Sequence, residues 1–487
     1  MQVSALLQEL RNAGSKDIDY QGSTEAEFVG LAVRARQSTA EGRCFFLVDD
    51  HWPKYWRKAT TWSQESAPRK IRAARAHGIS CIVVSRDILT PEVERELEGC
   101  NVFYVDNSYR FYFAVGYQIR RLNMDCNLTL ITGSVGKTTT TGMIAHAIRH
   151  LNQSVFVTHG SQNVPVAVIR NVSQTEGYDH AVIEASHGAC QAFTRLKYSV
   201  DANVSVVTSI AEAHLDVLKT LENVAKVKSA VFDGPPPAGT AVICLDAPYS
   251  DILVRRAVQA GRQLVTYGES PLATIRLVDY VPDTRRATVE IGRERITYHL
   301  GIDGKHIAIN SLAVIGVLRA YGMKNWREGV ESLVDFVPVS GRGERLTMDI
   351  APGLRISLIN EAYNANPASI RASLESLSSR NSDDGGRKIA ILGDILELGE
   401  QSEAAHRGLA DPVASADLDE IILFGDEMRV LHEELTRRRI ECHHFSDVDE
   451  MANALPSLLK DGDEVLAKAS HSMGLNAWVS KRTSEKE

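Results

Sequence analysis

The chain has 487 residues, which is too long for a single hydrophobic core and predicts about three domains. Hydrophobic residues make up 44% of the sequence and charged residues 24%, as in an ordinary globular protein. The net charge of −8 excludes a broad surface for binding nucleic acid.

The seven cysteines are dispersed without metal-binding spacing, which indicates reduced thiols. The first residues show no signal-peptide pattern, and no apolar run approaches the ~20 residues of a membrane span. We therefore expect a cytoplasmic monomer with no membrane span and no nucleic-acid partner.

Residues 1–125 alternate short strand-like and helical segments and form the first predicted domain, which would bind a substrate. Strands are predicted at 44–48, 81–84 and 102–105, and a helix at 69–77. The segment 51–62 contains three of the five tryptophans, next to lysine and arginine. This composition suits an anionic ligand with a planar or sugar group. The same aromatic side chains could instead anchor the segment to its own domain, and the sequence leaves both interpretations open.

Residues 126–336 form the second predicted domain. Strands at 128–132, 180–184, 204–208 and 241–245 alternate with helical sequence, which indicates a mostly parallel sheet covered on both faces. Residues 274–300 could add a small antiparallel piece. The pattern breaks around 337–343, and residues 337–487 form a third α/β domain with strands at 356–360, 388–392, 420–424 and 464–467.

Residues 128–151 read LTLITGSVGKTTTTGMIAHAIRHL, which predicts a strand, a glycine turn and a helix. In such a turn backbone N–H groups surround a phosphate, a lysine adds positive charge and a threonine hydroxyl can bind Mg²⁺. The residues expected to bind a nucleotide here are Gly133, Ser134, Gly136, Lys137, Thr138 and Thr139.

Glu184 ends another predicted buried strand. In a parallel sheet that end faces the ligand crevice, and Mg²⁺ prefers oxygen ligands. We expect Glu184 to bind Mg²⁺, although a glutamate at a strand end can also serve as a partner for a helix cap.

The short glycine turn, Thr132 to Thr138, resembles the phosphate loop of the Mur ligases and their relatives, the folylpolyglutamate and cyanophycin synthetases. Residues 207–216 resemble the segment of that family that supplies a Mg²⁺-binding histidine, here His214. At the same separation as in the family stands Lys228, which the resemblance implies to be carbamylated by CO₂. A single histidine or lysine is more often structural, so this assignment depends on the resemblance.

Three further stretches extend the resemblance. Residues 304–313 resemble the helix whose asparagine, here Asn310, contacts adenine, and residues 340–344 resemble the linker whose arginine, here Arg342, reaches the γ-phosphate. Residues 361–367, which begin with Glu361, and 392–399 resemble one branch, the UDP-N-acetylmuramoyl-tripeptide–D-alanyl-D-alanine ligases. We expect Glu361 to belong to the nucleotide-binding residues.

The sequence departs from that branch in the first and the third predicted domains. Gln37, Ser38 and Thr39 stand where a uridine-binding Asp-Ser-Arg motif is expected. Asn360-Glu361 replaces an Asp-Asp pair, and Ala469 replaces a glycine. The nucleotide-binding motifs therefore look intact, whereas the UDP-sugar-binding motif does not.

Together these patterns predict an α/β protein of three domains, with a central phosphate-loop domain built on a mostly parallel sheet and a Rossmann-like C-terminal domain. The resemblance implies an ATP- and Mg²⁺-dependent ligase that joins a small-molecule or peptide carboxylate to an amine through an acyl phosphate. The expected catalytic residues are Lys137, His214, Lys228 and Arg342, and the expected metal ligands are Thr138, Glu184, His214 and carbamylated Lys228.

The sequence favours a carboxylate substrate that is not a UDP-sugar, because the uridine motif is missing. The first alternative is the peptidoglycan substrate of the branch, bound by a rebuilt pocket. A second alternative, of another class, is a nucleotide-dependent binding or switch protein. The absence of an Asn-Lys-x-Asp guanine motif and the presence of candidate metal ligands argue against that switch.

Overall fold

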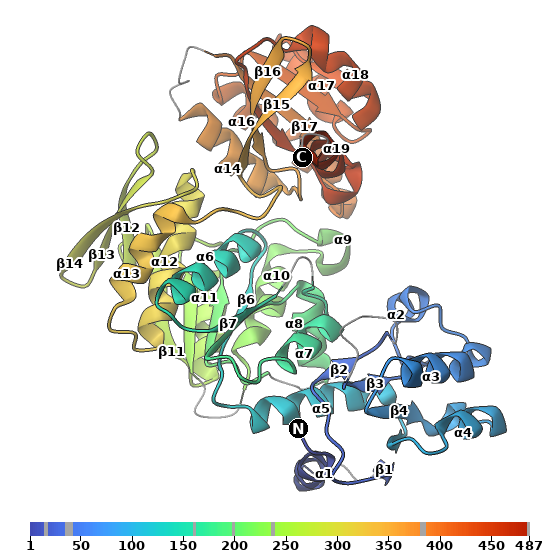
Figure 1. The fold of residues 1–487 in the computed structure, drawn as a ribbon. Coiled ribbons are helices and arrows are strands. Elements are labelled where there is room, and N and C mark those ends of the chain that lie inside the picture. Colours follow the sequence, from blue (N-terminus) through green and yellow to red (C-terminus); the bar gives the residue numbers. More distant parts are fainter. Residues whose placement is uncertain are drawn as a thin grey trace. The chain divides into compact units, whose positions relative to one another are not determined.

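The computed structural model of the chain describes residues 1–13, 18–34, 42–158, 162–196, 200–234, 239–379 and 386–484. It contains three β-sheets with helices between their strands (Figure 1). By compactness the chain divides into two units, residues 1–130, 154–203 and 233–238 in the first and 131–153, 204–232 and 239–487 in the second. The domain boundaries predicted near 125 and 336 stay predictions.

The first sheet has the strand order β1-β5-β4-β3-β2, with β2 to β5 parallel and β1 antiparallel to β5. Its strands are β1 (Ile18–Gln21), β2 (Leu31–Ala32), β3 (Cys44–Phe46), β4 (Cys81–Ser85) and β5 (Val102–Val105). The helices of this region are α1 (Val3–Asn12), α2 (Lys54–Ala59), α3 (Ala67–Ala76), α4 (Pro91–Leu97) and α5 (Ser108–Leu122).

Alternating side chains of β3 point to opposite faces of this sheet. Phe45 belongs to a buried cluster with Ile71 of α3 and Val93 of α4. Phe46 instead packs edge-on against Tyr112 of α5, with ring centroids 4.8 Å apart. The first sheet is therefore covered by helices on both faces.

The second sheet has nine strands in the order β14-β13-β12-β11-β10-β9-β6-β8-β7. Strands β9 to β12 are parallel, as are β7 and β8, whereas β12, β13 and β14 form an antiparallel meander. Its strands are β6 (Asn127–Thr132), β7 (Val155–Val157), β8 (His180–Glu184), β9 (Val204–Val207), β10 (Thr240–Cys244), β11 (Gln263–Gly268), β12 (Ile275–Val281), β13 (Arg286–Ile291) and β14 (Glu294–His299).

The helices that accompany this sheet include the one that begins in the phosphate loop. They are α6 (Lys137–His150), α7 (Pro165–Val172), α8 (His187–Leu196), α9 (Leu215–Leu218), α10 (Leu221–Lys228), α11 (Ser250–Gln259), α12 (Lys305–Ala320) and α13 (Trp326–Glu331). Helix α12 packs against α6 and against β10 to β12. Among the helices within the described ranges, none combines the length and the apolar character that crossing a bilayer requires.

The third sheet has the order β15-β16-β20-β17-β18-β19, in which only β15 runs antiparallel to its neighbour. Its strands are β15 (Glu344–Ala351), β16 (Leu354–Asn360), β17 (Lys388–Gly393), β18 (Glu420–Phe424), β19 (His443–Phe445) and β20 (Glu464–Lys468). The helices are α14 (Pro367–Ser378), α15 (Ser402–Arg407), α16 (Ala410–Ser415), α17 (Arg429–Arg437), α18 (Val448–Leu458) and α19 (Leu475–Ser484).

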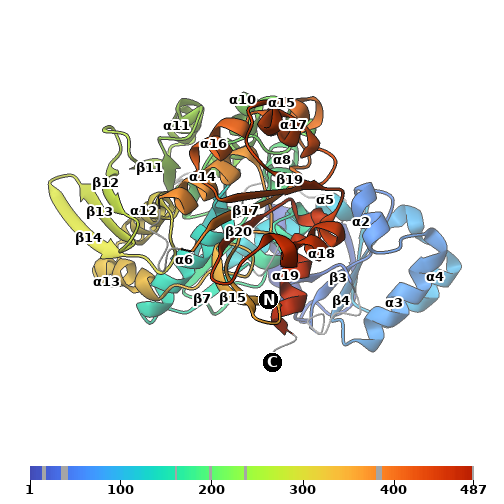
Figure 2. The ribbon, with the colours of Figure 1, turned by 90° about the horizontal axis from the view of Figure 1, so that it is seen from above.

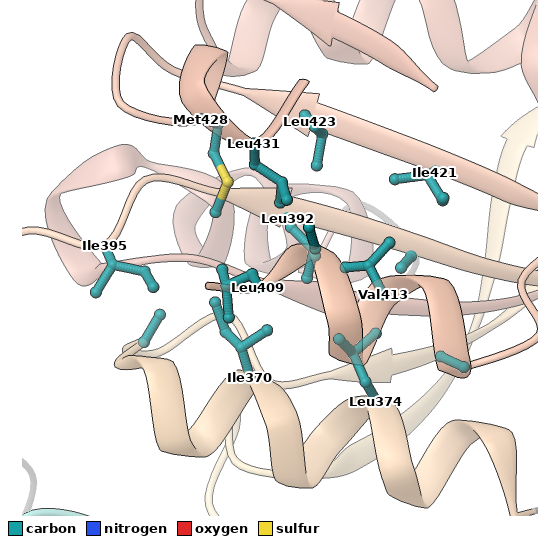
Figure 3. Packing of buried hydrophobic residues seen from close by; sticks show 14 of the residues in the cluster. Ile370, Leu374, Leu392, Ile395, Leu409, Val413, Ile421, Leu423, Met428 and Leu431 are labelled. Atoms are coloured by element: carbon teal, nitrogen blue, oxygen red, sulfur yellow. The ribbon is translucent and has the colours of Figure 1, made fainter. Parts of the chain in front are cut away.

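Two hydrophobic clusters lie on opposite faces of the third sheet. Helices α14, α16 and α17 contribute Leu374, Val413 and Leu431 to one cluster, shown in Figure 3. Helices α18 and α19 contribute Met451 and Val479 to the second cluster. Figure 2 shows these two helices on the opposite side of β17 and β20 from α14 and α16. A parallel sheet covered in this way confirms the predicted Rossmann-like domain.

The predicted α/β class and the antiparallel addition at 274–300 are confirmed. The tryptophan-rich segment contains the short helix α2 between Pro53 and Thr60. The motif position at Gln37, Ser38 and Thr39 lies outside the described residues.

Candidate active site

The phosphate loop joins β6 to α6, as predicted, and depends on glycine at position 133. The φ angle of Gly133 is +154°, and a Cβ there would lie 1.9 Å from Thr208 Oγ1. A side chain at this position would therefore push the loop away from the end of β9. Gly136, with φ +81°, immediately precedes the first residue of α6.

Hydrogen bonds fasten the phosphate loop to the segment that follows β9. The N–H of Ser134 donates to the carbonyl of Ser209 at 2.9 Å, and that of Val135 donates to Ser209 Oγ at 2.8 Å. Ser134 Oγ donates to the Ala211 carbonyl at 3.0 Å and accepts the Ala211 N–H at 2.9 Å. Ser134, predicted as a nucleotide-binding residue, therefore also fixes the shape of the loop.

Two lysines meet at one carbonyl of this loop. Lys137 Nζ donates to the Gly133 carbonyl at 2.9 Å and to that of Ser134 at 3.3 Å. Lys228 Nζ, at the end of α10, donates to the same Gly133 carbonyl at 2.8 Å. Lys228 is 2% exposed, so its amino group is held inside the protein next to the loop. The structure thus brings together Gly133, Lys137 and Lys228, three of the residues predicted to belong to the site.

His214 follows β9 and lies within electrostatic reach of both lysines. Burial, followed by the positive charges of Lys228 and Lys137, lowers the pKa of His214 to about 4. The imidazole is therefore neutral at pH 7, which is the form that binds metals. Its Nδ1 lies 2.5 Å from Glu397 Oε2. Because the ring is neutral, we interpret this contact as an Nδ1–H donated to the carboxylate, which leaves the lone pair on Nε2.

Asn310 on α12 lies against the phosphate loop. A Cβ on Gly136 would lie 2.7 Å from Asn310 Nδ2, so the carboxamide packs directly over this glycine. Asn310 is 8% exposed. The predicted adenine-contacting residue is thus next to the loop predicted to hold the phosphates.

Thr138 and Thr139 lie half-buried in the first turn of α6. Glu184, at the end of β8, belongs to the other compact unit. It is 2% exposed, and its carboxylate accepts a hydrogen bond of 2.7 Å from Asn163 Nδ2. The predicted buried strand end at Glu184 is therefore confirmed, while its role as a metal ligand stays a prediction.

Arg342 and Glu361 belong to a second group of residues, around β15 and β16. The guanidinium carbon of Arg342 lies 4.1 Å from the centroid of the Tyr363 ring. Glu361 is paired with Lys468 of β20, whose Nζ lies 2.8 Å from Glu361 Oε2. Burial alone would raise the pKa of Glu361, but Lys468, with His306, outweighs it and lowers the pKa to about 2.

Sequence reasoning did not identify three of these partners. Tyr363 lies in the stretch 361–367, Glu397 in 392–399 and Lys468 directly before Ala469, but the sequence assigns no contact to any of them. A signal existed for Lys468, because a lysine at the end of a buried strand requires a counter-ion. No sequence signal indicated which carboxylate would provide it.

The tryptophan-rich segment is tied to its own domain. Trp52 is 1% exposed, and its Nε1 donates to Ser108 Oγ at 2.7 Å. Asp50 accepts hydrogen bonds from both Arg57, at 2.9 Å, and Trp62 Nε1, at 3.2 Å. The anchoring interpretation is therefore supported for Trp52, Trp62 and Arg57, which are already engaged in intramolecular contacts.

Comparison with known proteins identifies the family. The Mur ligase middle domain matches residues 131–318, and the Mur ligase glutamate ligase domain matches residues 342–471. The chain belongs to the Mur ligase family. Members of this family are ATP-dependent, ADP-forming amide ligases, and this Mur ligase is accordingly an ATP-dependent carboxylate–amine ligase.

Two proteins similar in sequence to this chain are described as the same kind of ligase. The UDP-N-acetylmuramoyl-tripeptide–D-alanyl-D-alanine ligase of Bacillus subtilis is 27% identical over 355 residues, covering 72% of this chain and 74% of the relative. The ligase of the same description from Rickettsia prowazekii is 24% identical over 413 residues, covering 84% and 88%.

Two solved structures share the fold. MurF from Acinetobacter baumannii matches with a TM-score of 0.78 at 20% identity, covering 99% of this chain and 98% of that one. MurF from Thermotoga maritima, in complex with ADP, matches with a TM-score of 0.72 at 21% identity, covering 94% and 98%. The fold of this Mur ligase therefore matches over all three sheets.

The buried Glu361–Lys468 pair leads to a stability prediction. Lys468→Met should lower the free energy of unfolding by about 3 kcal/mol, because it leaves the Glu361 carboxylate buried without its cation. The double variant Glu361→Gln/Lys468→Met removes both charges and should recover most of the loss. Urea unfolding of the three proteins at pH 7 measures these differences.

The effect should also depend on pH. The pKa of Glu361 is about 2 in the folded chain against an ordinary value of 4.5, so its stabilising effect is complete above 4.5 and is lost as the pH falls toward 2. The difference between the parent and Lys468→Met should thus shrink between pH 7 and about pH 3.5. An undiminished difference at the lower pH would contradict the pairing.

Proposed function

We propose that this Mur ligase joins the amine of D-alanyl-D-alanine to a carboxylate of a UDP-N-acetylmuramoyl tripeptide. The main support is that the relatives of this description align with up to 84% of the chain. The match in fold extends over the first sheet, which is the region whose sequence diverges most from the branch. This proposal replaces the preference for a substrate that is not a UDP-sugar.

The expectation of a substrate that is not a UDP-sugar has two grounds. One is the missing uridine motif at residues 37–39, and the other is the set of aromatic and basic side chains between residues 52 and 62, which could hold a flat carboxylate by stacking and charge. The structure weakens the second ground. Trp52 is instead buried against Ser108, and Asp50 engages both Arg57 and Trp62. These side chains would have to give up existing contacts before they could bind a ligand.

The reaction we propose begins with transfer of the γ-phosphoryl group of ATP to the acceptor carboxylate. The amine then attacks the acyl phosphate, a tetrahedral intermediate collapses, and the amide and phosphate are released after ADP has formed. In this scheme Lys137 binds the β- and γ-phosphates from the phosphate loop, and Arg342 stabilises charge on the transferred group. Asn310 would contact adenine, and Glu361 would belong to the nucleotide-binding residues of the third sheet.

When bound, Mg²⁺ would neutralise charge on the phosphates. The chemistry of the donor set fits this ion. His214 supplies an imidazole nitrogen, Thr138 supplies a hydroxyl, and the buried amine of Lys228 becomes an anionic oxygen ligand when it reacts with CO₂. Within the described ranges no three His, Cys, Asp or Glu side chains gather into a ready-made metal site. We propose that Thr138, His214 and carbamylated Lys228 would hold the ion together with the phosphates, while Glu184, which belongs to the other compact unit, stays a predicted ligand.

A direct test of the substrate uses mass spectrometry. The protein is incubated with ATP, Mg²⁺, D-alanyl-D-alanine and UDP-muramoyl tripeptide, and in parallel with other carboxylates in place of the tripeptide. The proposal expects a UDP-linked pentapeptide and phosphate release that requires both substrates. Amide formation on another carboxylate alone would overturn the substrate, and phosphate release without amide formation would favour the switch.

The phosphate loop provides the second test. Lys137→Ala should lower ligation at least a hundredfold, roughly the effect of losing a charge aimed at the transferred phosphoryl group. Lys226→Ala is the matched control, because Lys226 is 57% exposed and pairs with Glu222. Ligation is followed by phosphate release, and folding by circular dichroism. Turnover of Lys137→Ala near the parent rate would contradict the assignment.

Carbamylation provides the third test. Lys228→Ala should be inactive, because it removes the anionic oxygens that we assign to the metal site, and added acetate or formate should restore part of the activity. Calorimetric titration with Mn²⁺ in the presence of ADP should show weaker binding in the variant, again restored by the short acid. Full activity of Lys228→Ala without any acid would refute this role.

A further inference from the structure

Tyr363 contacts both the side chain of Arg342 and the turn that precedes this arginine. Its guanidinium carbon lies 4.1 Å from the centroid of Tyr363, and the Tyr363 N–H donates to the Gly341 carbonyl at 3.1 Å. A Cβ on Gly341 would lie 3.0 Å from Tyr363 Cβ, so the turn before Arg342 packs tightly against this tyrosine. His471 packs on the same ring, with centroids 5.0 Å apart.

The carboxylates that follow Arg342 in the chain are occupied by other groups. Glu344 accepts hydrogen bonds from Ser340 Oγ at 2.7 Å and from Asn360 Nδ2 at 3.3 Å. Glu361 is taken by Lys468 at 2.8 Å and by Ser373 Oγ at 2.6 Å. Both acids are thus satisfied without Arg342.

The Arg342 guanidinium differs from these acids in its hydrogen bonding. Over residues 1–13, 18–34, 42–158, 162–196, 200–234, 239–379 and 386–484, it forms no hydrogen bond or ion pair. Its Nε is buried without a hydrogen-bond partner. A guanidinium that lies over a ring contacts it with its flat face. The N–H groups at the edge of the guanidinium stay available, and a phosphate can accept two of them.

We propose that Tyr363 is a positioning residue, whose ring fixes the plane of Arg342 so that its N–H groups are directed to the γ-phosphate of ATP. This inference rests on the proposed function, which assigns Arg342 to the transferred phosphoryl group. The tyrosine acts through stacking, so its ring is required and its hydroxyl is not. We expect phenylalanine at this position to preserve the orientation of Arg342, and leucine to lose it.

The experiment compares the affinities for AMP-PNP, which carries a γ-phosphate, and ADP, which lacks one, by calorimetry with Mg²⁺ present. Tyr363→Leu should weaken AMP-PNP binding about tenfold, as expected for the loss of a partly buried cation–π contact, and leave ADP binding unchanged. Tyr363→Phe should match the parent. Tyr178→Leu, which removes an exposed tyrosine of the first unit, is the control.

A double-mutant cycle with Arg342→Ala makes the test specific. If Tyr363 acts through Arg342, adding Tyr363→Leu to Arg342→Ala should weaken AMP-PNP binding no further. A selective loss in Arg342→Ala with none in Tyr363→Leu, or fully additive losses, would overturn the positioning role and leave the role of Arg342 standing. An unchanged AMP-PNP preference in Arg342→Ala would overturn both. Because no acceptor substrate is needed, the result does not depend on which carboxylate is joined.

Discussion

The close approach of Gly133 to Thr208 is the constraint on which the rest of the phosphate-binding region depends. The contact leaves no room for a Cβ, and it brings the turn after β6 against the segment after β9. That segment continues into His214. The Gly133 carbonyl belongs to the same turn and accepts hydrogen bonds from Nζ of both Lys137 and Lys228. A single missing side chain thus sets the positions of the loop, the histidine and two lysines.

Charge is distributed differently in the two groups of site residues. Around the phosphate loop, Lys137, Lys228 and His214 are close enough that the two lysines lower the pKa of the histidine. Around the third sheet, Glu361 is paired with Lys468, whereas Arg342 lies over the ring of Tyr363. The first arrangement places the positive charge of Lys137 next to the loop predicted to hold a polyphosphate, and the second keeps one arginine from being neutralised by nearby carboxylates.

The sequence could predict the parts of the site that depend on local patterns. The phosphate loop, the strand ending at Glu184 and the third sheet follow from hydrophobic periodicity and glycine placement, and the resemblance supplied His214, Lys228, Asn310 and Arg342. The Glu361–Lys468 contact could not be predicted, because it joins residues far apart in the chain through a sheet register that composition does not determine. The direction of a side chain is also a tertiary property. The sequence therefore leaves open whether the tryptophans at 52 and 62 form a ligand surface, and only the structure shows that Ser108 and Asp50 accept their N–H groups.

The burial of Lys228 has a consequence for chemical labelling. Lys226 and Lys228 are on the same short helix, but the side chain of Lys226 is 57% exposed, whereas Lys228 is 2% exposed and hydrogen-bonded to a carbonyl. An amine-reactive reagent applied to the native protein will modify the first and spare the second. Unfolding will make both reactive, because it exposes Lys228 and removes the surroundings that would stabilise a carbamate on it. Labelling before and after unfolding therefore reports on the folded state of this helix, while a carbamate has to be sought by spectroscopy on the intact, native chain.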